Sequence, residues 1–452
     1  MSDLTIIGGG LAGCEAAWQA AKQGVSVTLH EMRPSVQTPV HHTHFLSELV
    51  CSNSLGASDK IRPTGLLQNE LQRLGSFVLQ CAHETSLPAG GALAVDRIRF
   101  AQLVTERLES TPDITILRQE VTQIPAETTI IATGPLTSSA MAASISNLSG
   151  SDFLFFYDAL APIVTFDSIN LEKAFWGSRY SHSEDQAGDY LNCPFSEEEY
   201  FHFIRELTSA HRIPIKPFEE QIDNGVKANI LPFFESCLPI EVLASRHPEA
   251  LGYGPLRPVG IDSPQTGTKP YAVLQLRQDN VAKTLFNLVG FQTNLTHSEQ
   301  DRVFRLIPGL EEAEFVRYGQ MHRNTYINAP EMLLATTQFK QRENLFFAGQ
   351  VAGIEGYAGN IASGYLAGIN AGRFIHGQSL LVFPQETMIG AIHHYITHAD
   401  AQSFQPIKAN FGLLPEPEQK IQKKRDKKAN LANRALRALN DFMYENNIGT
   451  VP

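Results

Sequence analysis

The fold is decided by Thr5-Ile-Ile-Gly-Gly-Gly-Leu-Ala-Gly-Cys-Glu-Ala-Ala17 and the following Val25-Ser-Val-Thr-Leu-His-Glu31. An apolar strand is expected to run into the pattern Gly8-x-Gly10-x-x-Gly13, followed by a helix and a second strand that ends on an acid. The three glycines permit a tight turn, a close approach of the main chain to a pyrophosphate, and close packing of the helix on the strand. The stretch therefore predicts a dinucleotide site, for FAD or NAD.

In such a site the phosphates lie on the free N–H groups at the positive end of the helix. Glu31, which comes 18 residues after Gly13, is placed to accept hydrogen bonds from a ribose hydroxyl. The expected cofactor-binding residues of this stretch are Gly8, Gly9, Gly10, Leu11, Ala12, Gly13 and Glu31.

Composition describes an ordinary globular protein. The chain has 452 residues, enough for two or three domains, with 43% hydrophobic and 18% charged residues. No apolar run is long enough to span a membrane, and no basic targeting segment precedes the first strand. The five cysteines (14, 51, 81, 193 and 237) are odd in number and scattered, which argues against a disulfide framework or a zinc site. We therefore expect no bound metal and a cytoplasmic location.

The charge is uneven along the chain. The formal net charge is −11, which argues against broad affinity for nucleic acid. The segment 415–437, however, carries eight basic and three acidic residues, a local charge of +5. Such a run is often a solvated helix face, but it can also hold an RNA backbone. The candidate RNA contacts in it are Lys423, Lys424, Lys427 and Lys428.

The pattern of elements predicts an α/β protein in which an FAD-binding Rossmann-type domain is split by an inserted α+β domain. We expect the first part at 1–155, the insertion at 156–336, and the second part, with the basic segment, at 337–452. A strand ending at Thr133-Gly134 is expected to contact the adenosine half of the cofactor. A later strand and helix that carry Gly349, Gly353 and Gly356 are typical of FAD proteins and favour FAD over NAD.

Two of the cysteines have sequence contexts typical of active-site loops. Cys51 follows the histidine cluster 41–44, and Cys237 shortly precedes a helix expected to open at Pro239. A histidine or a helix N-terminus beside a thiol favours the reactive thiolate. The alternative for each is a small buried apolar side chain, to which we assign the other three cysteines.

Eight motifs spread along nearly the whole chain carry a family resemblance. They are Glu31-Met-Arg-Pro34, Glu48-Leu-Val-Cys-Ser-Asn-Ser-Leu55, Pro88-Ala-Gly-Gly-Ala-Leu-Ala-Val-Asp-Arg97, Ala132-Thr-Gly-Pro-Leu-Thr-Ser138, Tyr190-Leu-Asn-Cys-Pro194, Val289-Gly-Phe-Gln-Thr293, Met321-His-Arg-Asn-Thr325 and Phe404-Gln-Pro-Ile-Lys-Ala-Asn-Phe-Gly412. In these motifs the chain resembles the folate- and FAD-dependent tRNA (uracil-5-)-methyltransferases. It departs from that pattern in Gly356-Tyr-Ala-Gly-Asn-Ile-Ala-Ser-Gly364, which affects a local flavin or folate contact.

The resemblance implies methylation of C5 of uridine-54 in the T-loop of tRNA. The carbon then comes from methylenetetrahydrofolate and the electrons from reduced FAD, which NAD(P)H regenerates. Cys51 and Cys237 match the two cysteines that the family uses, as nucleophile and proton acceptor, with the assignment between them open. Arg277, His322, Arg323 and Tyr357 are candidates for holding the folate, against the alternative that they only maintain the fold.

Three alternatives stay open at this stage. A related flavoprotein modifies the wobble uridine of tRNA but has a longer C-terminal helical domain. The same methylation chemistry can act on a ribosomal RNA uridine. A flavin-binding RNA chaperone is a third possibility, which the intact cysteines disfavour. The oligomeric state and the choice between NADH and NADPH are not predicted.

Overall fold

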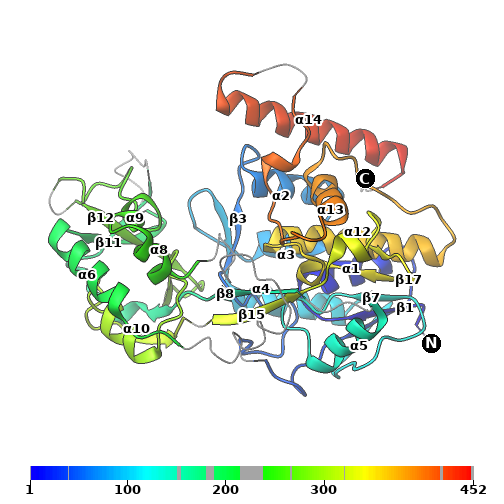
Figure 1. The fold of residues 1–452 in the computed structure, drawn as a ribbon, viewed down its shortest axis with the longest axis horizontal. Helices are drawn as coiled ribbons and strands as arrows, with labels where there is room; N and C mark the ends of the chain where they lie inside the picture. Colours follow the sequence, from blue (N-terminus) through cyan, green and yellow to red (C-terminus); the bar gives the residue numbers. More distant parts are fainter. Residues whose placement is uncertain are drawn as a thin grey trace.

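The computed structural model describes residues 2–38, 40–149, 154–179, 188–213, 238–264, 267–319, 321–417 and 421–448. Figure 1 shows two units side by side, with the chain leaving the first unit, forming the second and returning. In the described part of the chain, no helix is both long and apolar enough to cross a membrane.

The first unit is built on a six-stranded sheet. Its strand order is β16-β17-β7-β1-β2-β6, and every pair except β16·β17 is parallel. This order, with the first strand of the chain at the centre, is the Rossmann-type arrangement that the opening motif predicts. The strands are β1 (Leu4–Ile7), β2 (Val27–His30), β6 (Ile114–Leu117), β7 (Thr129–Ile131), β16 (Gln338–Phe339) and β17 (Arg342–Phe347).

Two helices from opposite ends of the chain pack closely on this sheet. They are α1 (Leu11–Ala21) and α12 (Tyr357–Ile375). A Cβ atom at Gly364 would lie 2.2 Å from the carbonyl oxygen of Ala12, and one at Gly368 would lie 2.5 Å from that of Ala16. The small residues of α12 therefore let the two helix backbones touch, which brings both helix N-termini to the same edge of the sheet.

The remaining elements of the first unit surround this core. The three-stranded sheet β3-β5-β4 consists of β3 (Ser54–Ala57), β5 (Ala92–Val95) and β4 (Ser86–Leu87). Asp96 caps α4, since its side chain accepts hydrogen bonds from two main-chain N–H groups of the first turn. The other helices are α2 (Pro63–Leu74), α3 (Phe77–Glu84), α4 (Arg97–Glu109), α5 (Ser139–Ser149), α11 (Ala329–Met332), η3 (Gly349–Ala352), α13 (Met388–His398), η4 (Phe411–Leu413) and α14 (Lys424–Glu445).

The second unit contains an antiparallel sheet with the order β10-β11-β12-β13-β9-β14. Its strands are β9 (Ile163–Thr165), β10 (Phe175–Gly177), β11 (Tyr190–Phe195), β12 (Ala272–Gln278), β13 (Leu285–Leu288) and β14 (Phe315–Arg317). Its helices are η1 (Phe166–Ser168), α6 (Glu197–Ser209), α8 (Ile240–Arg246), α9 (Ala250–Tyr253) and α10 (His297–Phe304). The sheet and helices enclose a separate apolar core.

Two paired strands connect the units. β8 (Leu154–Ala159) leaves the first unit, β15 (Met321–Tyr326) returns to it, and the two form an antiparallel ladder between the units (Figure 1). Tyr326 to Leu333 already pack in the core of the first unit. The division at 155 and 336 stays a prediction, and this packing favours a return near residue 326.

Candidate cofactor and active site

The turn between β1 and α1 needs two of its glycines for its own shape. Gly8 has a φ of +112°, and a Cβ there would lie 2.4 Å from the carbonyl oxygen of Ala132 on the neighbouring strand. A Cβ at Gly13 would lie 1.8 Å from the carbonyl oxygen of Gly8. Gly10, the N-cap of α1, differs because a Cβ there meets no protein atom within 4 Å. The chain thus leaves open space at the helix N-terminus, where a pyrophosphate is expected.

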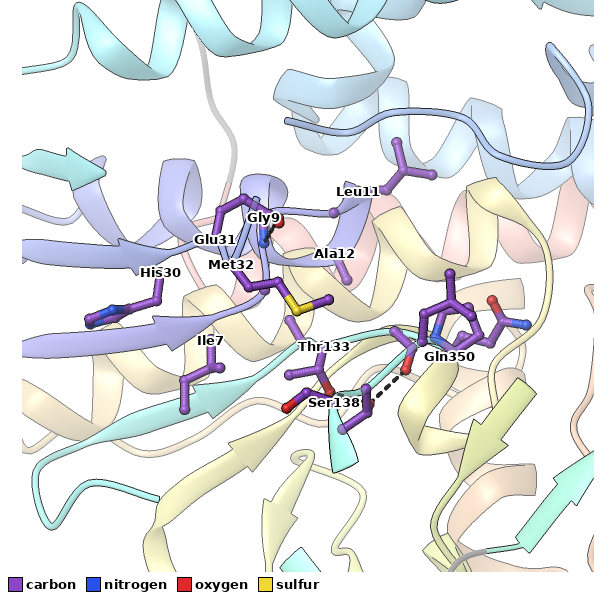
Figure 2. Close-up of a pocket in the computed structure, with 18 of the residues that line it drawn as sticks. Ile7, Gly9, Leu11, Ala12, His30, Glu31, Met32, Thr133, Ser138 and Gln350 are labelled. Atoms are coloured by element: carbon purple, nitrogen blue, oxygen red, sulfur yellow. Dashed lines mark hydrogen bonds between the residues drawn. The ribbon is translucent and has the colours of Figure 1, made fainter. Parts of the chain in front are cut away.

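A cavity that opens to solvent lies at this turn. Figure 2 shows Glu31, Met32, Thr133 and Gln350 around it, contributed by three segments far apart in the sequence. The expected cofactor-binding residues that line it are Gly8, Gly9, Gly10, Leu11, Ala12, Glu31, Thr133, Gly134 and Gly349. These residues fit a dinucleotide because the open space at Gly10 continues past the ends of β1, β2 and β7.

The other expected cofactor residues lie outside this lining. Gly13 is required by the packing of α1 on its own turn, and Gly353, at φ +81°, lies against the ring of Phe404. Gly356, at φ +82°, is the N-cap of α12 and lines a neighbouring cavity instead. These three glycines therefore shape the site, and direct cofactor contact by them stays a prediction.

The Glu31 carboxylate is held by the protein itself. It accepts hydrogen bonds from the Gly9 N–H at 3.1 Å and from the main-chain N–H and Nε of Arg33 at 3.0 and 2.9 Å. Burial alone would raise its pKa, but the hydrogen bonds and charge of Arg33 bring the pKa below its ordinary value. Arg33 also donates to Glu48 at 3.0 Å, so a buried ion network links the Glu31 carboxylate to the Cys51 loop.

A second cavity adjoins the first. The two share part of their lining, including Gln350, Tyr357 and Asn360. Cys51 lines the second cavity, and its main-chain N–H donates to the Tyr357 hydroxyl at 2.9 Å. Burial raises the pKa of Tyr357 above its ordinary value, so its hydroxyl stays protonated. The geometry places a partly exposed thiol beside the end of the cofactor cavity nearest α12.

Two arginines from different units hold the main-chain carbonyl of Cys51. Arg97 of α4 donates to this oxygen through Nη2 at 3.1 Å, and Arg317 of β14 donates to it at the same distance. Arg97 also forms a buried ion pair with Asp279 at 3.0 Å. Burial and the charge of Arg97 lower the pKa of Arg317 to about 10, so its guanidinium group stays charged near neutral pH. We call Arg97 and Arg317 the arginine clamp.

Of the other candidate residues, the structure describes the side chains of only some. Arg277 of β12 is buried and donates to the Asn53 side chain at 2.8 Å, two residues from Cys51. Tyr357 lines the second cavity. His322 and Arg323 lie on β15, but their side chains are outside the described part of the structure, and Cys237 is outside the described residues altogether. Sequence reasoning gave no role to Asn53 or Arg97, although both stand in quoted family motifs, and Arg317 stands in none of those motifs.

The remaining described cysteines are suited to packing. Cys14 is buried and donates to the Gly9 carbonyl at 3.3 Å, and burial raises its pKa to about 12. Burial raises the pKa of Cys81 to about 11, and that of Cys193 also lies above its ordinary value. Among the described residues, no group of three or more His, Cys, Asp or Glu side chains could hold a metal ion.

The four candidate lysines lie at the start of α14, which packs on α2 (Figure 1). Lys423 and Lys424 are exposed, while Lys427 forms an ion pair with Glu416 at 2.6 Å. The apolar side of the helix is buried through Leu431, Ala435 and Leu439. The first turns of α2, at Thr64 and Leu67, line the second cavity. One side of α2 thus faces the second cavity, while α14 packs on another side.

The comparisons with known proteins agree over nearly the whole chain. The family described as glucose inhibited division protein A matches residues 3–379. A protein of Bacillus licheniformis named methylenetetrahydrofolate–tRNA-(uracil-5-)-methyltransferase TrmFO is 52% identical over 439 residues, 97% of this chain and 98% of the relative. The protein of the same name from Natranaerobius thermophilus is 53% identical over 441 residues, 97% of this chain and 99% of that relative.

A solved structure supports the fold independently. GidA of Aquifex aeolicus, in its form II crystal, superposes with a TM-score of 0.69 at 16% identity, over 98% of this chain and 73% of that chain. Its form I crystal gives a TM-score of 0.68 at the same identity. At this identity the likeness shows the fold alone, and that fold is the split Rossmann-type architecture expected from the sequence.

Proposed function

Because the chain belongs to the methylenetetrahydrofolate–tRNA-(uracil-5-)-methyltransferase family, we propose that its two adjoining cavities carry out that reaction. The protein methylates C5 of uridine 54 in the T-loop of tRNA, with methylenetetrahydrofolate as carbon donor. It uses FAD, which NAD(P)H keeps reduced. Action on a wobble or ribosomal uridine is not favoured. We place the protein in the cytoplasm because its scattered cysteines suit a reducing compartment.

The observation that carries this proposal is the position of Cys51 in the cavity that continues from the dinucleotide site. Uracil C5 is a poor nucleophile until a thiolate adds at C6 and moves the C5–C6 double-bond electrons to an enolate. The enolate then attacks the donated methylene carbon. A base removes the C5 proton as the bond between the transferred carbon and the folate nitrogen breaks, which releases tetrahydrofolate and leaves a methylene group on C5. Addition of a hydride to that methylene group then breaks the C6–S bond and releases the thiolate. Cys51 and Cys237 supply these two groups, in an order that we leave unassigned.

Separate residues are proposed to bind the cofactor and to position the Cys51 loop. When bound, reduced FAD supplies the hydride that converts the transferred methylene group to a methyl group. Gly10 and the α1 N-terminus hold its phosphates, and Glu31 holds its ribose. Tyr357 fixes the Cys51 loop through the main-chain N–H of Cys51. Arg277, His322 and Arg323 remain candidates for the folate, together with Tyr357.

The direct test uses the purified protein with an unmodified tRNA transcript. We expect a yellow protein that adds one methyl group per transcript, identified as 5-methyluridine by mass spectrometry. The product should require methylenetetrahydrofolate and a nicotinamide reductant. Methylation supported by S-adenosylmethionine alone would contradict the proposal.

The arginine clamp should tune the reactivity of Cys51. Positive charge beside a thiol favours its thiolate, and two guanidinium groups on the Cys51 carbonyl fix the loop. In an Arg317→Gln protein we expect iodoacetamide to alkylate Cys51 about tenfold more slowly at neutral pH. The pH profile of that alkylation should move to higher pH, because losing the positive charge disfavours the thiolate. Peptide mass spectrometry measures the rate at Cys51 itself.

Arg302→Gln is the matched control for the clamp. Arg302 is an exposed arginine of α10 that pairs with Glu206 and Glu299 on the surface of the second unit. Its replacement should leave the alkylation rate of Cys51 unchanged. If Arg317→Gln also leaves both the rate and the pH profile unchanged, the clamp does not act on the thiol.

The basic start of α14 is proposed to contact the tRNA backbone. We expect a variant with Lys423, Lys424, Lys427 and Lys428 all replaced by Gln to bind tRNA more weakly. Its affinity should also depend less on salt, with the slope of log K against log salt reduced by up to about three, because each neutralised phosphate contact releases a counterion. Filter binding at several salt concentrations measures both quantities.

The control for the lysine variant replaces four lysines elsewhere on the surface, namely Lys22, Lys173, Lys269 and Lys283. Both variants lose the same charge, so a general effect of net charge would weaken tRNA binding equally. If the two variants lose tRNA affinity equally, the start of α14 is only a solvated helix face and does not contact tRNA.

A further inference from the structure

Asn324 is a buried side chain whose polar atoms have no protein partner. It lies in β15, where its main chain is in register with Phe156 of β8. The side chain is 0% exposed, and neither Oδ1 nor Nδ2 makes a hydrogen bond. Among the described residues, no other side chain leaves two polar atoms buried and unpaired. Burying an unpaired amide costs free energy, so such a group calls for an explanation.

The position of Asn324 supplies that explanation. It lines the second cavity together with Cys51 and Tyr357. Asn287 and Asn294 each have one unpaired buried amide atom, but neither lines this cavity or the adjoining one. The unpaired amide of Asn324 therefore lies in the wall of the second cavity, the same wall that carries Cys51.

We propose that the Asn324 amide binds the edge of a heterocycle in which a ring N–H stands next to a carbonyl group. Its Oδ1 accepts from the ring N–H while Nδ2 donates to the neighbouring carbonyl, a bidentate pairing that side-chain amides make with nucleobase edges. Both unpaired atoms are satisfied at once by such an edge, which a single hydroxyl or a water molecule does not match as well.

The identity of the ring rests on the proposed function. The isoalloxazine of FAD, the target uracil and the pterin of the folate all present an N–H beside a carbonyl. Their shared edge is the chemistry that Asn324 recognises. An experiment with one arm for each of the three molecules identifies which ring occupies the site.

The experiment compares the wild type with Asn324→Leu, which keeps a similar volume and removes both polar atoms. Because the amide is unpaired without a ligand, the flavin-free variant should unfold at the same temperature as the wild type or above it. One of three quantities should worsen by about ten- to a hundredfold. These are the Kd for FAD from absorbance titration of the apoprotein, the KM for methylenetetrahydrofolate, and the KM for the tRNA transcript.

Two further variants keep the test decisive. Asn324→Asp retains an acceptor for the ring N–H but offers no N–H to the carbonyl, so it should weaken the same ligand. Asn287→Leu removes a buried amide that also has an unpaired Nδ2 but does not line the cavity, so it should change none of the three quantities.

A loss confined to FAD, to folate or to tRNA supports the inference and names the ring. If both Asn324 variants leave all three quantities within twofold of the wild type, the inference is overturned. It is also overturned if Asn324→Leu fails to fold or lowers the apoprotein unfolding temperature while Asn324→Asp binds all three ligands normally. A wild-type protein that binds FAD through Asn324 but does not methylate tRNA would overturn the proposed function and leave this inference standing.

Discussion

Replacing Cys51 by alanine is expected to lower kcat for uridine methylation by roughly a thousandfold or more, while FAD remains bound. Cys51 is partly exposed and lines the second cavity, whereas the residues proposed to hold the cofactor phosphates and ribose line the first. Whether Cys51 adds to C6 or removes the C5 proton, the reaction lacks an essential group without it. The yield of 5-methyluridine and the flavin absorbance of the purified variant measure the two effects.

Cys81→Ala is the matched control for this change. Cys81 is a buried residue of α3 and lines neither of the two adjoining cavities, so its loss should leave methylation close to the wild-type rate. Full turnover by Cys51→Ala with FAD bound would remove Cys51 from the mechanism. We expect the same severe loss for Cys237→Ala.

Replacing Gly10 by valine is expected to weaken FAD binding by roughly a hundredfold or more. The new side chain would occupy the space at the α1 N-terminus where the pyrophosphate approaches the main chain. No protein atom lies within 4 Å of the added Cβ, so the fold should be retained. The purified variant should be colourless, and titration with FAD should give the raised Kd.

Gly91→Val is the control for this change. A Cβ at Gly91 also meets no protein atom within 4 Å, but Gly91 lines neither adjoining cavity. This variant should bind FAD as the wild type does. A Gly10→Val protein that remains yellow, with an unchanged Kd, would show that the cofactor does not lie on this turn.

The first unit could be predicted from the sequence because its signals are local. Strand, glycines, helix and acid follow one another within the first 31 residues, and the structure has β1, α1 and β2 there. The helix at Pro239 was also predicted correctly, since α8 begins at the next residue. These features depend on near neighbours in the chain, which a single sequence displays.

The surroundings of Cys51 could not be predicted in the same way. Arg97 ends a quoted motif and Arg317 stands in none, but neither sequence context indicates a contact with Cys51, and only the folded chain brings both to one carbonyl oxygen. Asn324 was part of a quoted motif, but a buried unpaired amide is recognised only from the packing around it. The Glu31 carboxylate was expected to accept hydrogen bonds from a ribose, and in the structure it also accepts them from Gly9 and Arg33.

The two hydrogen bonds to the main-chain carbonyl of Cys51 come from arginines that lie far apart in the sequence. Arg317 reaches a peptide group 266 positions earlier, and it does so from the inserted unit. An excised Rossmann core would thus keep Cys51 but lose one of the two guanidinium groups that bind its main-chain carbonyl. A chimaera in which another domain replaces the inserted unit would lose the same hydrogen bond, unless the new domain placed an arginine at the Cys51 carbonyl.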